Sequence, residues 1–175
     1  MRRYMIPALA LLLLGGCAQT TVTQQQSYEG SRLARPGRVI VYDFAASASD
    51  LPAGYDLAGA VSAPATPPTA NDQNLGRKLG AEVAKNLVDE LQGMGLLAVR
   101  AAGQPPPQLN DVAILGYFVS VNPGDIAKRF ALGFGSGAAE LRTVVEVYVQ
   151  SATGLRRLGS AELDSTGPKG PGEAL

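Results

Sequence analysis

Apolar residues recur at helical spacing in one stretch of the chain, residues 74–92. The stripe consists of residues four apart and of two neighbours that widen it: Leu75, Leu79, Val83, Leu87, Leu91, Ala84 and Val88. The charged residues lie largely off this stripe and are of both signs, so the pattern predicts an amphipathic helix that packs on a core rather than on a membrane surface. Asp72 or Asn74 can cap its start, and Gly93 or Gly95 can supply the left-handed residue that ends it.

Short β-branched and aromatic runs predict strands on both sides of this helix. The runs cover residues 38–44, 96–100, 111–121, 142–150 and 155–164. Gly116 interrupts the third run, and a glycine inside a strand indicates a bulge or a close backbone approach. Residues 151–154 are typical of a hairpin turn. The order predicts an α+β domain: a small mixed or antiparallel sheet, β-α-β followed by a β-meander, with one main amphipathic helix on one face.

Three segments lack these patterns. Residues 17–36 are rich in Gln, Thr and Ser and are predicted to form a flexible tether. Residues 45–73 are rich in Ala, Ser, Pro and Gly, which predicts a long loop, functional or disordered. Residues 166–175 are predicted to be a disordered tail. A single domain is therefore expected over residues 37–165.

The N-terminus has the parts of a secretory signal: Arg2 and Arg3, then an apolar run, then a cleavage site of small residues. The site is Leu14, Gly15, Gly16 and Cys17. It resembles the lipobox of bacterial lipoproteins, and the apolar run is too short for a spanning helix, which needs about 20 residues. The sequence thus predicts that residues 1–16 are removed and that Cys17 carries acyl chains such as palmitate, which anchor the protein to a membrane.

The residue after the cysteine is Ala18 rather than aspartate. In lipoproteins of Gram-negative bacteria, an aspartate at this position is the usual signal for retention in the inner membrane. The resemblance therefore implies an anchor in the outer membrane, with the folded domain facing the periplasm.

Composition excludes several functions. Fifteen basic and fifteen acidic residues balance, and loss of Arg2 and Arg3 with the signal leaves the mature chain slightly negative, which argues against nucleic-acid binding. The chain has no histidine, and Cys17 is its single cysteine, so His-based catalysis, disulfides and thiolate metal sites are excluded. We predict no catalytic residue, no metal and no cofactor. Four carboxylates near strand ends keep a hydrolase open as an alternative: Asp43, Asp111, Asp125 and Asp164.

A glycine-rich segment separates the third and fourth predicted strands. Its candidate interaction residues are Lys128, Arg129, Phe130, Leu132, Gly133, Phe134, Gly135 and Gly137. One interpretation is a phosphate cradle, but the Gly-x-Gly-x-Gly spacing and the lack of a following Gly-Lys-Ser/Thr disfavour it. If the apolar side chains are exposed, they form a patch for a partner protein or a bilayer. Alternatively, they pack into the sheet, and the glycines allow tight turning.

Several segments together resemble the bacterial lipoproteins that carry the domain of unknown function 4410. The matching segments are the strand 39–44, the helix with Leu87 and Leu91, the strand segment 115–118, the turn 122–124 and the glycine-rich segment 129–137. They cover roughly residues 36–165. The resemblance implies no activity and transfers no catalytic residue. Members often continue past the last strand into further helix, which implies that the C-terminal layer is shortened here.

These observations predict an exported, lipid-anchored envelope protein of non-enzymatic character. It is expected to act as a periplasm-facing interaction or accessory module, with the membrane and an envelope protein as partners and no nucleic acid. A self-assembling, oligomeric subunit of an export system or pore is one alternative. A carboxylate-dependent hydrolase is the other, and it requires two carboxyl groups that face one cleft.

Overall fold

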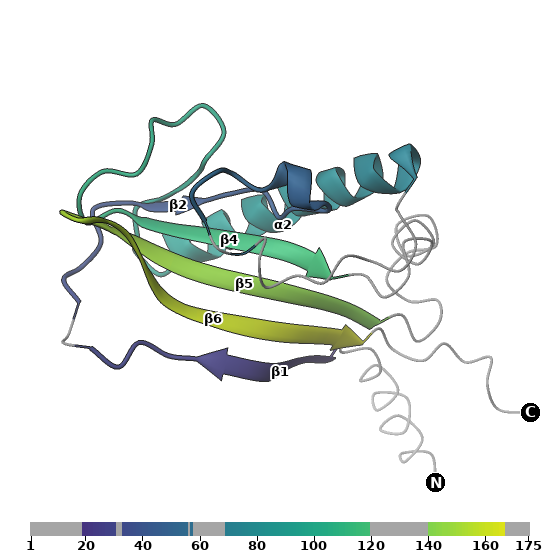
Figure 1. Cartoon of the computed structure of the whole chain (residues 1–175), viewed down its shortest axis with the longest axis horizontal. Helices are drawn as coiled ribbons and strands as arrows, with labels where there is room; N and C mark the ends of the chain where they lie inside the picture. The colour runs from purple at the N-terminus through teal and green to yellow at the C-terminus, as the bar shows by residue number, and fades with distance from the viewer. Residues whose placement is uncertain (1–18, 31–32, 56, 58–68, 120–139, 167–175) are drawn as a thin grey trace, which may run out of the picture.

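The structure of the chain is a computed structural model, shown in Figure 1. It describes residues 19–30, 33–55, 57, 69–119 and 140–166. These residues form a six-stranded sheet with one long helix on one face. The predicted α+β class is therefore confirmed.

The sheet is mixed. Its strands are β1 (Gln19–Gln26), β2 (Val39–Val41), β3 (Ala98–Arg100), β4 (Val112–Val119), β5 (Glu140–Ser151) and β6 (Gly154–Thr166). They lie in the order β1-β6-β5-β4-β2-β3. β2 pairs in parallel with β3 and β4, whereas β4, β5, β6 and β1 pair antiparallel in succession. The expected β-α-β unit followed by a meander is present.

The helix α2 (Ala70–Gly93) begins four residues before the predicted start. Neither Asp72 nor Asn74 is the cap. Thr69 is, because its hydroxyl accepts a hydrogen bond from the Asp72 amide at 3.2 Å, and the Asp72 carboxylate accepts one from the Thr69 amide at 3.0 Å. The first turn holds no large apolar residue, so hydrophobic spacing alone could not locate it. Past the other end, Gly95 adopts the left-handed conformation with φ +79°, as expected.

The buried face of α2 differs from the predicted leucine stripe. Its buried positions are Gly76, Gly80, Ala84, Val88 and Leu91. Ala84, Val88 and Leu91 belong to the predicted stripe, whereas its other members, Leu75, Leu79, Val83 and Leu87, are only half-buried. Small residues face the sheet because the chain after β2 lies directly against the helix: the Phe44 amide donates to the Gly80 carbonyl at 3.2 Å.

Phe44 is held between α2 and β4. A Cβ atom at Gly80 would lie 1.9 Å from the Phe44 carbonyl oxygen, and one at Gly116 would lie 2.1 Å from the Phe44 ring. Both positions therefore require glycine. The expectation that Gly116 marks a close approach is confirmed, and the approaching group is the aromatic ring.

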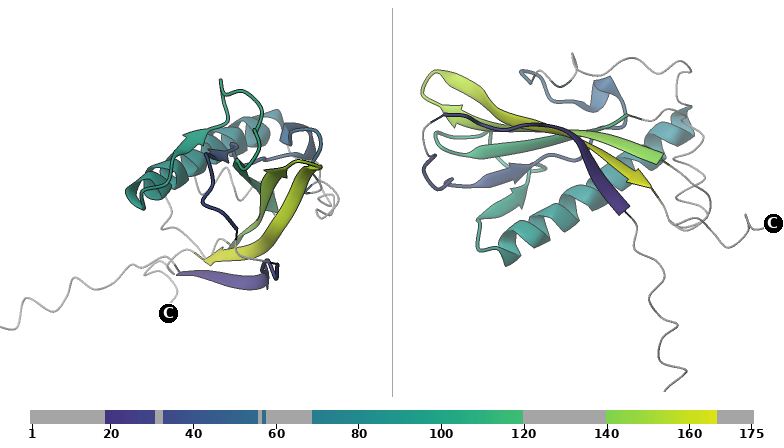
Figure 2. Two further views of the ribbon diagram at one scale, coloured as in Figure 1. Left: turned by 90° about the vertical axis from the view of Figure 1, so that its left-hand side faces the viewer. Right: turned by 90° about the horizontal axis from the view of Figure 1, so that it is seen from below.

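The core lies on both faces of the sheet. On the α2 side, Val39, Val41 and Ala98 pack against the helix. On the other side, Ala45, Leu51, Tyr55 and Leu57 pack in a cluster with Leu115 of β4. Part of the predicted loop 45–73 is thus packed structure, with a 3-10 turn, η1 (Ala48–Asp50), and a completely buried Leu57. Figure 2 shows this segment and α2 on opposite sides of the sheet.

The predicted tether also contains regular structure. Residues 19–26, within the segment 17–36, form β1, which pairs antiparallel with β6. Polar Gln and Thr side chains do not prevent this, because strand pairing uses backbone groups, and an edge strand needs no apolar face. A periodicity of apolar residues could not reveal such a strand.

An ion pair joins the start of β2 to the start of β4. The Arg38 guanidinium donates two hydrogen bonds, of 2.6 and 3.1 Å, to the buried Asp111 carboxylate, which also accepts one from the Gln108 amide at 2.9 Å. Burial alone would raise the pKa of Asp111. The bonds from Arg38 and the Gln108 amide outweigh burial and hold this pKa below its ordinary value of 3.8.

This lowered pKa predicts a pH dependence of stability. Asp111 stabilises the fold above about pH 4, and the contribution is lost as the pH falls through the lowered folded-state pKa. Urea unfolding between pH 7 and pH 2 should therefore show a smaller loss of stability on acidification in Asp111→Asn than in the wild type. Asp89→Asn, which alters an exposed i,i+4 pair with Lys85, should follow the wild-type profile. Identical profiles for both variants would contradict the assignment.

Candidate functional site

The lipobox and the candidate loop are both connected to the same end of the sheet. Gln19 at the start of β1 lies opposite Thr166 of β6, which in turn lies opposite Glu140 at the start of β5. Val119, where β4 ends, lies opposite Arg142. β1 and β5 thus begin, and β4 and β6 end, at this same end, on the right in Figure 1.

The predicted site residues themselves lie outside the described residues. They are the lipobox, Leu14, Gly15, Gly16 and Cys17, and the candidate loop, Lys128, Arg129, Phe130, Leu132, Gly133, Phe134, Gly135 and Gly137. The exposure of Phe130 and Phe134 therefore stays a prediction. The structure does bring their neighbours in sequence together: Gln19 follows Cys17 by two positions, and Val119 and Glu140 flank the segment that holds the loop.

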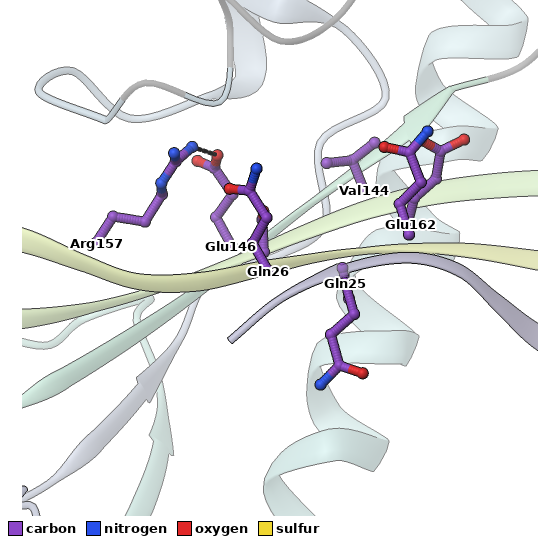
Figure 3. A pocket seen from close by; sticks show the side chains of 9 residues that line it. Gln25, Gln26, Val144, Glu146, Arg157 and Glu162 are labelled. Atoms are coloured by element: carbon purple, nitrogen blue, oxygen red, sulfur yellow. Dashed lines mark hydrogen bonds and ion pairs between the residues drawn. The ribbon is translucent and has the colours of Figure 1, made fainter. Parts of the chain in front are cut away.

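A second feature, which sequence reasoning missed, is a shallow hollow on the sheet face opposite α2. It has a volume of about 260 Å³ and is open to solvent. Figure 3 shows it. It is formed by three neighbouring strands, and its lining is Gln24, Gln25 and Gln26 of β1, Val144 and Glu146 of β5, and Arg157, Ser160, Ala161 and Glu162 of β6.

Glu146 is the buried charge of this hollow, with 1 % of its surface exposed. The Tyr148 hydroxyl donates a hydrogen bond to Glu146 Oε2 at 2.6 Å, and Arg157 Nη1 donates to Oε1 at 2.9 Å, the contact drawn in Figure 3. Charge-assisted bonds of this kind compensate for the loss of water around a buried carboxylate. The Arg157 side chain remains 44 % exposed, so the guanidinium is reachable from the hollow.

Aromatic rings connect Glu146 to the core. The Tyr148 ring makes an edge contact with Tyr55 at a centroid distance of 5.0 Å, and the Tyr55 hydroxyl donates to the Tyr42 hydroxyl at 3.2 Å. Burial, together with the interaction with Tyr42, raises the pKa of Tyr55 well above its usual value, so the hydroxyl stays protonated. These contacts support Tyr148, which in turn holds the Glu146 carboxylate at the hollow.

The hollow offers hydrogen-bonding groups of several kinds. Glutamine and serine side chains lie beside two carboxylates, Glu146 and Glu162, which meets the minimum geometry set above for a hydrolase. Each carboxylate is however already engaged by an arginine: Glu146 by Arg157, and Glu162 by Arg142 at 2.8 Å. Among the described residues, no three acidic, histidine or cysteine side chains are grouped so that they could hold a metal ion. The arrangement suits recognition of a polar group better than proton transfer.

The match to a known family covers the whole core of this structure. The family described as "Domain of unknown function (DUF4410)" matches residues 39–172, from the start of β2 to beyond the end of β6. The chain belongs to this family. The resemblance noted from the sequence is confirmed for the domain, and the lipoprotein part of it stays a prediction.

Proteins of known structure that are similar to this chain include PelC. Dodecamers of PelC from Paraburkholderia phytofirmans match at 19 % and 17 % identity with TM-scores of 0.42 and 0.41. The first match covers 85 % of this chain and 81 % of the PelC chain, and the second covers 85 % and 83 %. No curated protein matches the chain. No helix in the described part of this chain is both long and apolar enough to cross a membrane.

Proposed function

We propose that the protein is a non-enzymatic interaction module, anchored through Cys17 to the outer membrane and facing the periplasm. The observation that carries this proposal is the position of β1. Its first residue, Gln19, follows Cys17 by only two positions, and two extended residues reach about 7 Å. A lipid on Cys17 would therefore hold this end of the sheet against the bilayer surface, with no long tether between them.

The same end of the sheet carries the strand ends that flank the candidate loop. Since Val119 and Glu140 lie at the end where β1 begins, the segment between them is attached to the domain beside the anchor. Phe130, Leu132 and Phe134 are the large apolar residues of the candidate loop in this segment. A partner bound there would itself lie at or in the membrane, which favours an envelope protein over a freely diffusing one.

The residue types available in the chain and in the hollow support a binding role. The chain has no histidine, and both carboxylates of the hollow are engaged by arginines. A retaining or inverting glycosidase needs a carboxylic acid that can donate a proton to the substrate. The hollow is better suited to hold a polar group than to cleave one.

Capture from membranes tests the proposal. Affinity-tagged wild-type chain, purified from solubilised membranes, is expected to retain an envelope protein that a Phe130→Ser/Phe134→Ser variant loses. The matched control is Leu97→Ser/Leu109→Ser, which removes two apolar side chains that are 64 % and 69 % exposed elsewhere on the domain. A third chain, Cys17→Ser, is expected to leave the membrane fraction.

Two results would contradict different parts of the proposal. If Cys17→Ser stays in the membrane fraction as firmly as the wild type, the lipid anchor is wrong. If the control loses the same protein as the loop variant, or if the loop variant retains it with an unchanged melting temperature, the docking site does not lie on the loop.

A further inference from the structure

β1 is a sheet edge that lacks most of the features that usually prevent strand pairing. Its eight residues, Gln-Thr-Thr-Val-Thr-Gln-Gln-Gln, include no charge and no proline, and the side chains from Thr20 to Gln26 are all exposed. One side of the strand pairs with β6, so the backbone groups of the other side face outward. Natural edge strands are normally protected by lysine, proline, shortness or a covering element. Among the residues that the structure describes, β1 has none of these four features, and its one protective feature is an irregularity of the bulge type between Val22 and Gln24.

The opposite edge of the described sheet is protected. β3 has only three residues, and α2 packs against it. At its end, the Arg100 guanidinium forms an ion pair with Asp43 at 2.5 Å. An eight-residue strand cannot find a matching edge there. The two edges are therefore different in kind, and only β1 can accept a long strand.

We propose that β1 pairs with β1 of a second copy of this chain, antiparallel and about a two-fold axis. The partner edge must be β1 because β3 is too short and is protected by charge. A two-fold contact uses the same surface on both copies and closes after two, so it does not lead to filaments. Uncharged Gln and Thr side chains suit such self-pairing, because no like charges are brought opposite each other.

The pairing has a definite geometry. Val22 lies near the middle of β1 and would lie close to Val22 of the partner, while the two Gln19 residues would lie at opposite ends, roughly 24 Å apart along the strand direction. The two sheets would continue into each other, with both hollows on the same face. Gln24 and Gln26 line each hollow from β1, so the hollows would flank the dimer axis. The proposal goes beyond the proposed function and does not depend on it.

Charge placed at the centre of the strand tests the pairing. Full-length Val22→Lys and Val22→Glu variants, purified in detergent, are expected to be monomers by light scattering, with a dissociation constant for the dimer at least tenfold above that of the wild type. Val22→Gln, which is polar but neutral, should remain a dimer. Mixing the Lys and Glu variants should restore a dimer, because in a two-fold contact the opposite charges then face each other.

Cross-linking checks the position directly. A short bis-maleimide is expected to join Val22→Cys chains and not Ala152→Cys chains, whose residue lies exposed in the β5–β6 turn. Wild-type protein serves as a separate control, since a cross-link in it would show an unmodified Cys17 thiol and count against the lipid anchor alone. A wild type that is monomeric at all concentrations, or an oligomer that persists in Val22→Lys and fails to cross-link at position 22, would overturn the proposal.

Discussion

Replacing Gly80 with alanine is expected to lower the free energy of unfolding by about 3 kcal/mol. The same exchange in an ordinary helix position raises stability by up to about 1 kcal/mol, because glycine is the more flexible residue. At Gly80 the added Cβ would lie 1.9 Å from the Phe44 carbonyl oxygen and 2.9 Å from its carbonyl carbon. These are backbone atoms, and they are held in place because the Phe44 amide donates to the Gly80 carbonyl. The helix must therefore move away from the sheet.

Gly93, in the last turn of the same helix, is the matched control. A Cβ at Gly93 would meet nothing within 4 Å, so Gly93→Ala should be neutral or slightly stabilising. Urea unfolding of the two variants, followed by circular dichroism, compares the same chemical change in two environments. Effects of the same sign would show that the close contact between Phe44 and α2 does not govern stability.

The two glycines also show what hydrophobic spacing can predict about a helix. The leucine pattern correctly predicts that residues 74–92 are helical, because charged residues fall between the apolar ones. It predicts the C-terminal part of the buried face, Ala84, Val88 and Leu91, but not the N-terminal part, since Gly76 and Gly80 contribute no hydrophobic signal. The role of Gly76 depends on Ala46 and that of Gly80 on Phe44, and each of these neighbours lies at least thirty positions away in sequence. A pattern within one segment carries no information about such a contact.

The strands differ in the same way. β4 and β5 are rich in β-branched and aromatic residues, and the sequence predicts both. β1 is polar and exposed, and it forms because the backbone of β6 offers an unpaired edge beside it. Gly159 of β6 helps, since a Cβ there would lie 2.5 Å from the Gln26 carbonyl oxygen. The composition of this segment alone indicates a tether, because composition carries no information about β6, the neighbouring strand that orders the segment.

The candidate sites were accessible to sequence reasoning to different degrees. The lipobox and the glycine-rich loop are contiguous motifs, so residue order is enough to propose them. The hollow is assembled from three strands and has no contiguous motif. One signal was present: Glu146 interrupts an otherwise apolar and aromatic run from Val144 to Val149. A charged residue at such a position indicates a buried partner, which the structure identifies as Arg157, across the β5–β6 hairpin.

Replacing Arg157 with methionine is expected to lower the free energy of unfolding by about 2 kcal/mol. Glu146 would keep the hydrogen bond from Tyr148 but lose the one from the guanidinium at 2.9 Å. The Glu146 carboxylate is 99 % buried, so water cannot readily replace the lost bond. A buried carboxylate without its cation is costly, and the effect is below the largest measured values because Arg157 itself is half-exposed. Arg142→Met provides the comparison: Arg142 pairs with the more exposed Glu162, so its loss should cost less than about 1 kcal/mol.

A second variant distinguishes the loss of the Glu146–Arg157 ion pair from the cost of leaving the Glu146 carboxylate buried without a cation. If the cost in Arg157→Met arises because Glu146 is left without its cation, then removing the carboxylate as well should recover stability. Glu146→Leu/Arg157→Met is therefore expected to be more stable than Arg157→Met alone, since a buried ion pair can often be replaced by apolar residues at little cost. Urea unfolding of Glu146→Leu, Arg157→Met and the double variant measures this coupling. A double variant less stable than Arg157→Met would mean that Glu146 stabilises the fold through Tyr148, independently of the arginine.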